Sequence, residues 1–341
     1  MRTKRSSSVT IRDVARKAGV SVATVSRYIN QNAPVSTEAA ERLNQVMSEL
    51  RYVPHATARN LASRKTRVIG LLLTNMDNDF FAPLVNGIEQ IVRQEHYNLL
   101  VATYHADNRD SVPPPVGPHN CDGLLVFADS LPDAELANLH ESGFPMVLIH
   151  RSSPGSLPIA SVTVENKSAA YRLVEHLIVQ HNRKRIVFLR GPIHQEDSYW
   201  RETGYRTALE SHGIATDERL ILTGEFEREI AYRALNEFLN GEKPVPFDAV
   251  FAGDDNSAIG VLDALIEHGY RVPEDIAVVG FDDLRLSAFL TPPLTTVRAP
   301  TETVGKIAAE RLFGALNKEA SPEIVLLPTE LIIRRSCGCQ P

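Results

Sequence analysis

The sequence predicts an all-α head over residues 1–54, a linker over 55–66, and a larger α/β region over 67–341 that contains two doubly wound parallel sheets. Three observations lead to this fold class. A chain of 341 residues is too long for one ordinary hydrophobic core. The net charge changes sign after the first 65 residues, and near residue 67 the apolar pattern changes from helical spacing to alternating strands and helices.

The charge difference between the two parts favours a nucleic-acid partner for the head. Residues 1–65 carry twelve Lys and Arg against four Asp and Glu, a net charge of +8. Since the whole chain carries −6, the remainder carries −14. A small basic module beside an acidic region is typical of DNA binding, because neutralising phosphates releases counterions. Charge alone leaves a solvated basic arm equally open.

The bulk composition is that of a globular protein, with 43% apolar and 23% charged residues. No run of eighteen apolar residues occurs, and the basic, Ser-rich start is followed by no apolar stretch, so we expect a cytoplasmic protein that is neither exported nor membrane-bound. The three cysteines, Cys121, Cys337 and Cys339, are too few for a disulfide framework, which fits a reducing compartment.

Within the head, two short helices joined by a glycine turn predict a helix-turn-helix unit. Thr10 and Ser21 can cap helices over 11–18 and 22–29, and Gly19 can end the first. Apolar residues four positions apart place Val14 with Ala18, and Val25 with Ile29, on one face of each helix. A third helix over 36–50 closes the small core with an apolar stripe of Leu43, Val46, Met47 and Leu50.

A second helix held in this way exposes its N-terminal residues, which such units place against base edges in the major groove. Here the exposed residues are Val22, Ala23, Ser26 and Arg27. Arg27 can make a bidentate contact to guanine, while Val22 and Ala23 can meet thymine methyls. The side chains expected to reach phosphates are those of Thr10, Ser21, Thr24, Asn30 and Ser36. Taken singly, each could equally be a helix cap or an ordinary surface group.

An ordered series of short motifs resembles the head of the lactose and galactose repressor family. It covers about forty-five positions: Thr10-Ile11-Arg12-Asp13-Val14-Ala15, Ala18-Gly19-Val20-Ser21, Thr24-Val25-Ser26-Arg27, Asn30, Val35-Ser36 and Leu50-Arg51-Tyr52-Val53-Pro54. The resemblance implies a transcriptional regulator, a homodimer or a pair of dimers that places two heads on a palindromic operator.

The resemblance also implies that residues 55–63 form a hinge helix only on specific DNA. Leu61 stands at the family's intercalating position, with Ala58 and Arg59 as further DNA contacts. Physics supports such a wedge, because a pyrimidine-purine step unstacks cheaply and an inserted apolar side chain bends the duplex. Without the family, Leu61 could be an ordinary core leucine.

Beyond residue 67, short apolar and β-branched runs alternate with helical stretches, which predicts parallel sheets covered on both faces. We expect ligands where the carboxyl ends of both sheets face one cleft. The predicted strands are 68–73, 99–102, 124–127, 146–149, 162–164, 186–189, 220–222, 250–252 and 276–279. The predicted helices are 80–95, 132–141 and those starting at Lys167, Trp200, Arg228, Asn256 and Thr303.

Polar and aromatic residues after these strands supply a candidate effector pocket, since carboxylates and guanidinium groups can hold vicinal hydroxyls and an aromatic face can pack on a sugar ring. The residues are Asp77, Asn78, Phe80, His150, Trp200, Arg201, Asp254 and Asp282. The family's effector core is similar to periplasmic sugar-binding proteins, and the resemblance implies contacts from Arg201, Asp254 and Asp282. It also implies one lobe from 67–164 and 298–322, and another from 165–297 and 323–341. Each aspartate could instead be a helix N-cap.

One stretch departs from the family. Most members carry a helix between the second and third strands, whereas residues 111–120 include Pro113, Pro114 and Pro115 in succession. Consecutive prolines are excluded from a helix interior and favour an extended path. We therefore expect the first lobe to lack that helix.

No motif for catalysis, a cofactor or a metal emerges, and we expect none of them. Gly-x-Gly-x-x-Gly, Gly-x-Ser-x-Gly and His-Glu-x-x-His are absent. His176 and His181 are five residues apart, on different helix faces, and Cys337 with Cys339 offers two thiols without further ligands. A sugar-modifying enzyme would explain a cleft but not the head, and a transport receptor would need an export signal. The effector is expected to be a sugar or sugar derivative, with a sugar acid or phosphate left open by His150 and Arg151.

Overall fold

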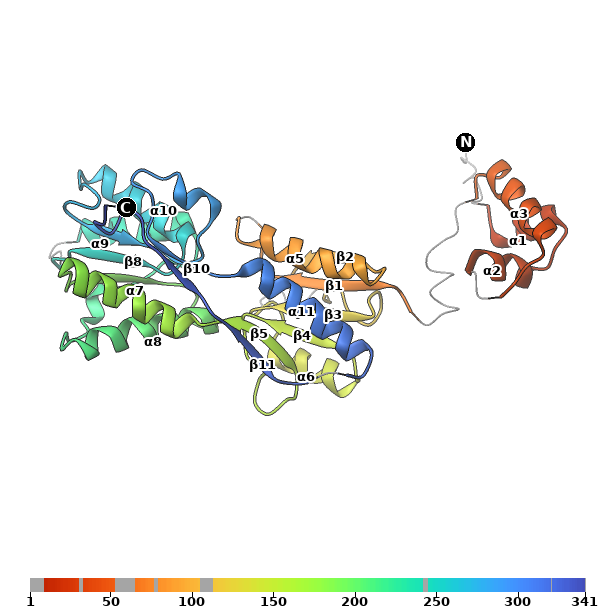
Figure 1. Cartoon of the computed structure of the whole chain (residues 1–341), viewed down its shortest axis with the longest axis horizontal. Helices are drawn as coiled ribbons and strands as arrows, with labels where there is room; N and C mark the ends of the chain where they lie inside the picture. Colours follow the sequence, from red (N-terminus) through yellow and green to blue (C-terminus); the bar gives the residue numbers. More distant parts are fainter. Residues whose placement is uncertain are drawn as a thin grey trace, which may run out of the picture. The chain divides into compact units, whose positions relative to one another are not determined.

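The computed structural model of the chain describes residues 9–30, 33–52, 65–76, 79–104, 113–241, 245–319 and 321–340. They belong to two compact units, Met1–Thr66 and Arg67–Pro341 (Figure 1). None of the helices in these ranges is long and apolar enough to cross a membrane.

In the described part of the first unit the chain forms three helices, each within one residue of its predicted bounds. They are α1 (Ile11–Ala18), α2 (Val22–Asn30) and α3 (Thr37–Glu49). The backbone N–H and hydroxyl of Thr10 donate to the carboxylate of Asp13 in the first turn of α1, and Gly19 ends this helix in the left-handed conformation with φ of 66°. The buried core consists of Val14, Ala15, Ala18, Val25, Leu43 and Val46. The predicted helix-turn-helix is confirmed.

The second unit has two lobes, and lobe 1 is a six-stranded parallel sheet in the order β11-β5-β4-β3-β1-β2. Helices α5 (Phe81–Gln94) and α11 (Thr301–Leu316) pack on one face, and α6 (Asp133–Glu141) packs on the other (Figure 1). The strands are β1 (Val68–Leu73), β2 (Asn98–Thr103), β3 (Gly123–Phe127), β4 (Met146–Ile149), β5 (Ala160–Val164) and β11 (Ile324–Leu327). Both faces are covered, so the central strands are wholly apolar.

Lobe 2 is a four-stranded parallel sheet in the order β7-β6-β8-β9. Helices α7 (Asn166–His181) and α8 (Glu196–Ser211) cover one face, and α9 (Arg228–Leu239) and α10 (Asp255–Glu267) cover the other. The strands are β6 (Ile186–Arg190), β7 (Ile221–Thr223), β8 (Ala249–Ala252) and β9 (Ala277–Val279). The predicted pair of doubly wound parallel sheets is confirmed.

The chain passes between the lobes three times. It enters lobe 2 after β5, returns to lobe 1 after β10 (Thr296–Arg298), and leaves again through β12 (Glu330–Ile332), which pairs antiparallel with β10 (Figure 1). The predicted return to lobe 2 at residue 323 is wrong, because β11 pairs with β5 of lobe 1. The alternation of strands and helices does not identify this strand, since β11 is an edge strand with exposed side chains.

Residues 113–122, from the proline-rich segment, contain no helix, as predicted; residues 105–112 lie outside the described ranges. Val116 and Cys121 are buried against Leu72 and Leu124 on the face that α6 covers. Gly70 makes room for them, because a Cβ at this position would lie 3.1 Å from the Cys121 sulfur. A short irregular segment thus covers sheet surface that a helix would otherwise protect.

Candidate functional site

Two surfaces qualify as functional sites, one in each unit, and the first is the N-terminal end of α2. Val22 and Ala23 are exposed there, with 43% of Val22 accessible, whereas Val25 is fully buried against α1 and α3. Arg27 is exposed too, in the last turn of the same helix. Exposed aliphatic side chains suit thymine methyls, and an exposed guanidinium suits a guanine edge. Ser26 is half-buried and Thr24 likewise, on the flank of the same helix.

The hydroxyls predicted to reach phosphate have helix-terminal positions in the head. Ser21 Oγ accepts a bond of 3.0 Å from the backbone N–H of Thr24 and lies 2.9 Å from its hydroxyl. Ser36 Oγ accepts from the backbone N–H of Ala39 at 3.4 Å. They therefore act as caps here, which leaves them with further lone pairs for other donors. The side chain of Asn30 and all of Ala58, Arg59 and Leu61 lie outside the described residues.

The second surface is a cavity of about 950 Å³ between the lobes, at the carboxyl ends of both sheets. This volume is within the range of small-molecule sites. Lobe 1 contributes Thr74, Asn75, Phe80, Phe81, Phe127, Ala128, Asp129, Leu131, Pro132, Asp133, Ala134 and Arg151; lobe 2 contributes Pro192, His194, Gln195, Asp197, Arg201, Glu225, Phe226, Glu227, Ile230, Asp254 and Asp282.

Arg201, on α8, is the centre of a buried polar network in this cavity. It is 2% exposed, and its guanidinium donates to Asn166 Oδ1 (2.9 Å), to the carbonyl of Gly253 (2.7 Å) and to Asp282 Oδ1 (3.2 Å). The ring of Phe281 lies under the guanidinium, 3.8 Å from its carbon to the ring centre. The group is thus fixed on several sides before any ligand binds.

Asp197 extends the network to lobe 1. Its carboxylate accepts from Asn166 Nδ2 at 2.7 Å and is hydrogen-bonded to His150 Nδ1, also at 2.7 Å. Burial by itself raises the pKa of Asp197, but His150, Arg201 and Asn166 outweigh it and lower the pKa below the usual value. Asp197 is therefore ionised at neutral pH.

In two other carboxyl groups of the cavity the pKa is raised rather than lowered. Burial, together with the nearby charge of Asp282, raises the pKa of Asp254 to about 6. Burial also raises the pKa of Asp282, despite its contact with Arg201. Asp254 Oδ1 accepts from the backbone N–H of Ser257, so it also caps α10. The cavity thus holds carboxyl groups that ionise at different pH values.

Aromatic rings line the lobe 1 side. Phe80, Phe81 and Phe127 meet edge to face with centroids 5.2–5.8 Å apart, and the ring of His150 packs against Phe80 and Phe127. On the lobe 2 side Phe226 faces Arg201 at 5.3 Å. This combination of aromatic faces and fixed polar groups is suited to a ring that is apolar on its faces and hydroxylated at its edge.

Several non-glycine residues at the cavity hold the left-handed backbone conformation, which is costly for them. Ala128 (φ 44°), His150 (57°), Phe226 (59°) and Asp282 (103°) all follow or closely approach strand ends. Such conformations persist where surrounding contacts enforce them, and they concentrate at binding sites.

Hydrogen bonds cross the cavity from lobe to lobe. Asp129 of lobe 1 accepts from Gln195 Nε2 at 2.8 Å and lies 2.7 Å from His194 Nε2. The hydroxyl of Ser152 donates to Glu196 at 2.8 Å. Together with the His150–Asp197 bond they hold the two lobes around the cavity.

The predicted effector residues have different places in this arrangement. Phe80, Arg201, Asp254 and Asp282 line the cavity, and His150 is 2% exposed and contacts Asp197 from behind the lining. Trp200 does not line it: the side chain is 40% exposed and packs on Tyr199. Asp77 and Asn78 lie outside the described residues.

Sequence reasoning missed Asp197 because it placed the start of α8 at Trp200, and it missed Asn166 because the partners of this residue, Asp197 and Arg201, are distant in the sequence. Helix α8 begins at Glu196, four residues earlier, so Asp197 is buried in its first turn, one helical turn from Arg201. The run from Gln195 to Asp197, with an acidic pair in a first helical turn, is the signal that could have indicated this start.

Comparison with protein families gives two matches. Residues 10–55 match the family described as "Bacterial regulatory proteins, lacI family", and residues 174–337 match "Periplasmic binding protein-like domain". The chain is 36% identical over 335 residues to the HTH-type transcriptional regulator GalR of Escherichia coli (strain K12), covering 97% of this chain and 96% of that protein. It is 32% identical over 333 residues to catabolite control protein A of Priestia megaterium, covering 96% and 99%.

Solved structures agree with the sequence matches. The lac repressor dimer bound to operator and the anti-inducer ONPF superimposes with a TM-score of 0.79 at 27% identity, covering 97% of this chain and 99% of that chain. The complex of the transcriptional regulator CelR with cellobiose gives a TM-score of 0.72 at 30% identity, covering 96% and 99%.

Proposed function

Because the chain belongs to the LacI family of bacterial regulatory proteins and is a DNA-binding transcriptional regulator, we propose that it acts as a homodimeric repressor controlled by a neutral sugar. The observation that carries the effector part is the buried Arg201 network in the cavity. A regulator of this kind acts where the operator DNA lies, in the cytoplasm. The relatives are regulators, and we propose no enzymatic role for the chain.

In the head, we assign base contacts to Val22, Ala23, Ser26 and Arg27, and phosphate contacts to Thr10, Ser21, Thr24, Asn30 and Ser36. The exposure of Val22 and Ala23 in the first turn of α2, and of Arg27 in its last turn, supports the first group. The positions at helix starts support the second, since backbone N–H groups and hydroxyls gather there. In the hinge, Ala58 and Arg59 would contact DNA while Leu61 unstacks a central base step.

The cavity's charge favours a neutral effector over a sugar acid or sugar phosphate. Among the described residues, seven carboxyl groups line it (Asp129, Asp133, Asp197, Glu225, Glu227, Asp254 and Asp282) against two guanidinium groups. Both guanidinium groups are already engaged: Arg201 with Asp282, and Arg151 with Asp133 at 2.6 Å and with two backbone carbonyls. An added anion would find these cations paired and would meet uncompensated carboxylates.

Carboxylates and a fixed guanidinium can hold the vicinal hydroxyls of such a sugar, with Phe80 and Phe226 against its ring faces. Cellobiose, bound by the structural neighbour CelR, is a neutral sugar of this chemistry. We propose that the effector contacts Phe80, Arg201, Asp254 and Asp282. Asp197 is proposed as a further contact, and His150 as the residue that positions Asp197. Asp77 and Asn78 follow β1 in the sequence and remain proposed contacts.

Control of DNA binding would pass through the bonds between the lobes. A ligand that alters the contacts of Asp129 with His194 and Gln195 changes the relative position of the lobes, and hence the spacing of two hinges in a dimer. Coupling of about 1–3 kcal/mol, or roughly 5- to 150-fold in operator affinity, is typical of such systems. By linkage, operator DNA must change effector affinity by the same factor.

Selection of duplexes from a random DNA pool at fixed salt tests the DNA-binding part. The parent is expected to enrich a palindrome with a central pyrimidine-purine step, and Leu61→Ala to bind that duplex more weakly. Enrichment of single half-sites, unaffected by Leu61→Ala, would contradict the dimer and the hinge.

Titration of a sugar panel against the full-length protein, with and without the selected duplex, tests the effector part. Neutral sugars are expected to bind and the matching uronic acids and sugar phosphates to fail. Effector affinity that is the same with and without operator would remove the coupling, and preference for an anionic ligand would refute the charge argument.

A further inference from the structure

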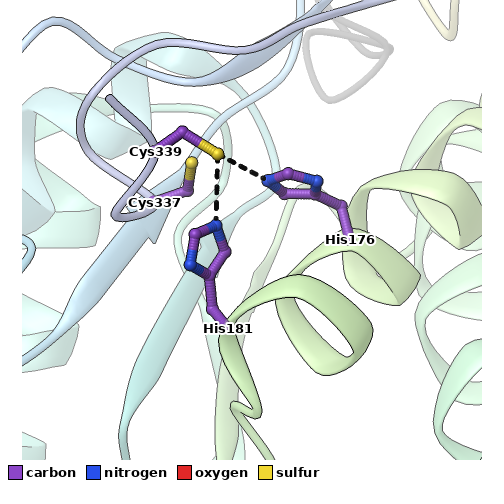
Figure 2. Close-up of side chains that lie close together, drawn as sticks. All are labelled: His176, His181, Cys337 and Cys339. Carbon is purple, nitrogen blue, oxygen red and sulfur yellow. Dashed lines mark hydrogen bonds between the residues drawn. The ribbon is translucent and has the colours of Figure 1, made fainter. Parts of the chain in front are cut away.

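Outside the cavity, the structure brings together two imidazoles and two thiols from distant parts of the chain. Figure 2 shows His176 and His181, from α7, facing Cys337 and Cys339 of the C-terminal segment. Cys339 Sγ lies 3.4 Å from His181 Nε2 and 3.7 Å from His176 Nε2. One potential ligand atom from each of the four side chains lies within 4.8 Å of the others.

These separations approach those of a tetrahedral zinc site. Zinc binds thiolate sulfur at about 2.3 Å and imidazole nitrogen at about 2.0–2.1 Å, so ligand atoms on a tetrahedron lie roughly 3.3–3.8 Å apart. Both distances from the Cys339 sulfur are already in that range. Small rotations of the four side chains would bring the distances between the other pairs of ligand atoms into the same range.

Local backbone features build the cluster. His181 is the last residue of α7, and Asn182 leaves the helix in the left-handed conformation. Because the helix ends there, the ring centroids of His176 and His181 come within 5.0 Å of each other despite the five-residue spacing. Gly338 has φ of 112°, a conformation that favours glycine, and it turns the chain between the two cysteines.

The surroundings suit a bound cation. Cys337 is fully buried, and the hydroxyl of Thr295 donates to its sulfur at 3.1 Å, the kind of hydrogen bond that supports a thiolate ligand. The carbonyl end of the α7 dipole also favours positive charge here.

We propose that His176, His181, Cys337 and Cys339 hold one Zn²⁺ and so fasten the C-terminal segment to the end of α7. Four protein ligands fill the tetrahedron, which is typical of a structural rather than a catalytic ion. The two thiolates balance the +2 charge of the ion, and the two imidazoles bind it as neutral ligands. Binding releases the two thiol protons to solvent.

The sequence gives little sign of this site, since Cys339 is 163 positions from His176. Neither pair forms a recognised zinc motif alone. Only the return of the chain to lobe 2 after β12 brings the pairs together.

Metal analysis of the full-length protein, purified without a polyhistidine tag or chelator, tests the proposal. We expect about one zinc per chain, and loss of most of it in Cys339→Ser and in His176→Gln. Matched controls are Cys121→Ala, which removes the third cysteine, and His140→Gln, in the last turn of α6; both should keep the metal. Replacing zinc by Co²⁺ in the parent should give tetrahedral ligand-field bands and a thiolate charge-transfer band, which does not depend on any variant folding.

Three results would overturn the proposal. The first is a parent that takes up no zinc even after incubation with zinc and a reductant. The second is a zinc content that the two ligand variants leave unchanged. The third is a Cys337–Cys339 disulfide in the protein isolated without reductant, with one free thiol instead of three.

Discussion

Two polar clusters occupy opposite ends of α7, and they are balanced in different ways. At the first residue, Asn166 joins the network in which the cation Arg201 is surrounded by carboxylates. At the other end, His176 and His181 meet the sulfur atoms of Cys337 and Cys339. The first cluster contains its own cation, whereas the second has the ligands for one. The comparison separates a polar cluster whose positive charge comes from an arginine of the chain from a cluster whose ligand atoms suit a cation taken up from solution.

The largest effect should follow removal of the internal cation. Arg201→Met leaves Asp282 and Asp197 buried without their guanidinium partner, which is expected to lower the free energy of unfolding by about 3–5 kcal/mol. Urea denaturation of the full chain measures it. Arg219→Met is the control, because Arg219 is paired with Asp217 at 2.6 Å but its side chain is 71% exposed, so the expected loss is far smaller than that of Arg201→Met. Equal losses in the two variants would mean that the network does not depend on its cation.

The next effect concerns the proton on Asp254. Its folded pKa of about 6 exceeds the ordinary 3.8, so the folded protein binds more protons than the unfolded chain between these pH values. The contribution of protonated Asp254 to the free energy of unfolding is therefore complete below about pH 4. This contribution, about 2–3 kcal/mol, is lost as the pH rises through 6.

Comparing urea denaturation of the parent and Asp254→Asn across pH 4–7 isolates this contribution. The variant should lose less stability than the parent over that interval, by the amount given above. Parallel pH profiles for the two proteins would show that the carboxyl group keeps its ordinary pKa.

The smallest effect separates backbone strain from contact at the second cluster. Gly338→Ala would place a Cβ 3.1 Å from His181 Nδ1 at φ of 112°, whereas Gly269→Ala, at φ of 76°, meets nothing within 4 Å. Both substitutions should lower the free energy of unfolding by about 1–2 kcal/mol, because alanine is strained at a positive φ. Only Gly338→Ala should also weaken zinc retention, which metal analysis of the two variants can compare. Unchanged zinc in both would show that this turn does not position the thiols.

Local signals explain which parts of the fold could be predicted. Thr10 and Gly19 delimit α1, because an N-cap residue and a glycine in the left-handed conformation act on residues close to them in the sequence. Strand β1 could be predicted because it is an unbroken apolar run between polar segments. The start of α8 and the strand β11 were mispredicted for a shared reason. Their identities depend on contacts with distant residues: Asp197 with His150, and β11 with β5.

The candidate sites follow the same division. Arg201, Asp254 and Asp282 could be named in advance because they follow or face strand ends, where parallel sheets concentrate ligands. The cluster of His176 and Cys339 could not, since a spacing of five on a helix argues against a shared site unless the helix ends at the second histidine.

The three passages of the chain between the lobes bear on synthesis at the ribosome. Lobe 1 has five of its strands once residue 164 is made, yet α11, which covers one face, ends at residue 316, and the edge strand β11 ends at 327. At roughly 5–20 residues per second, that interval lasts on the order of ten seconds or more. Throughout it, Leu84 and Ile88 of α5 lack the partner helix against which they are buried. The nascent first lobe therefore leaves apolar side chains of α5 without their cover until translation is almost complete.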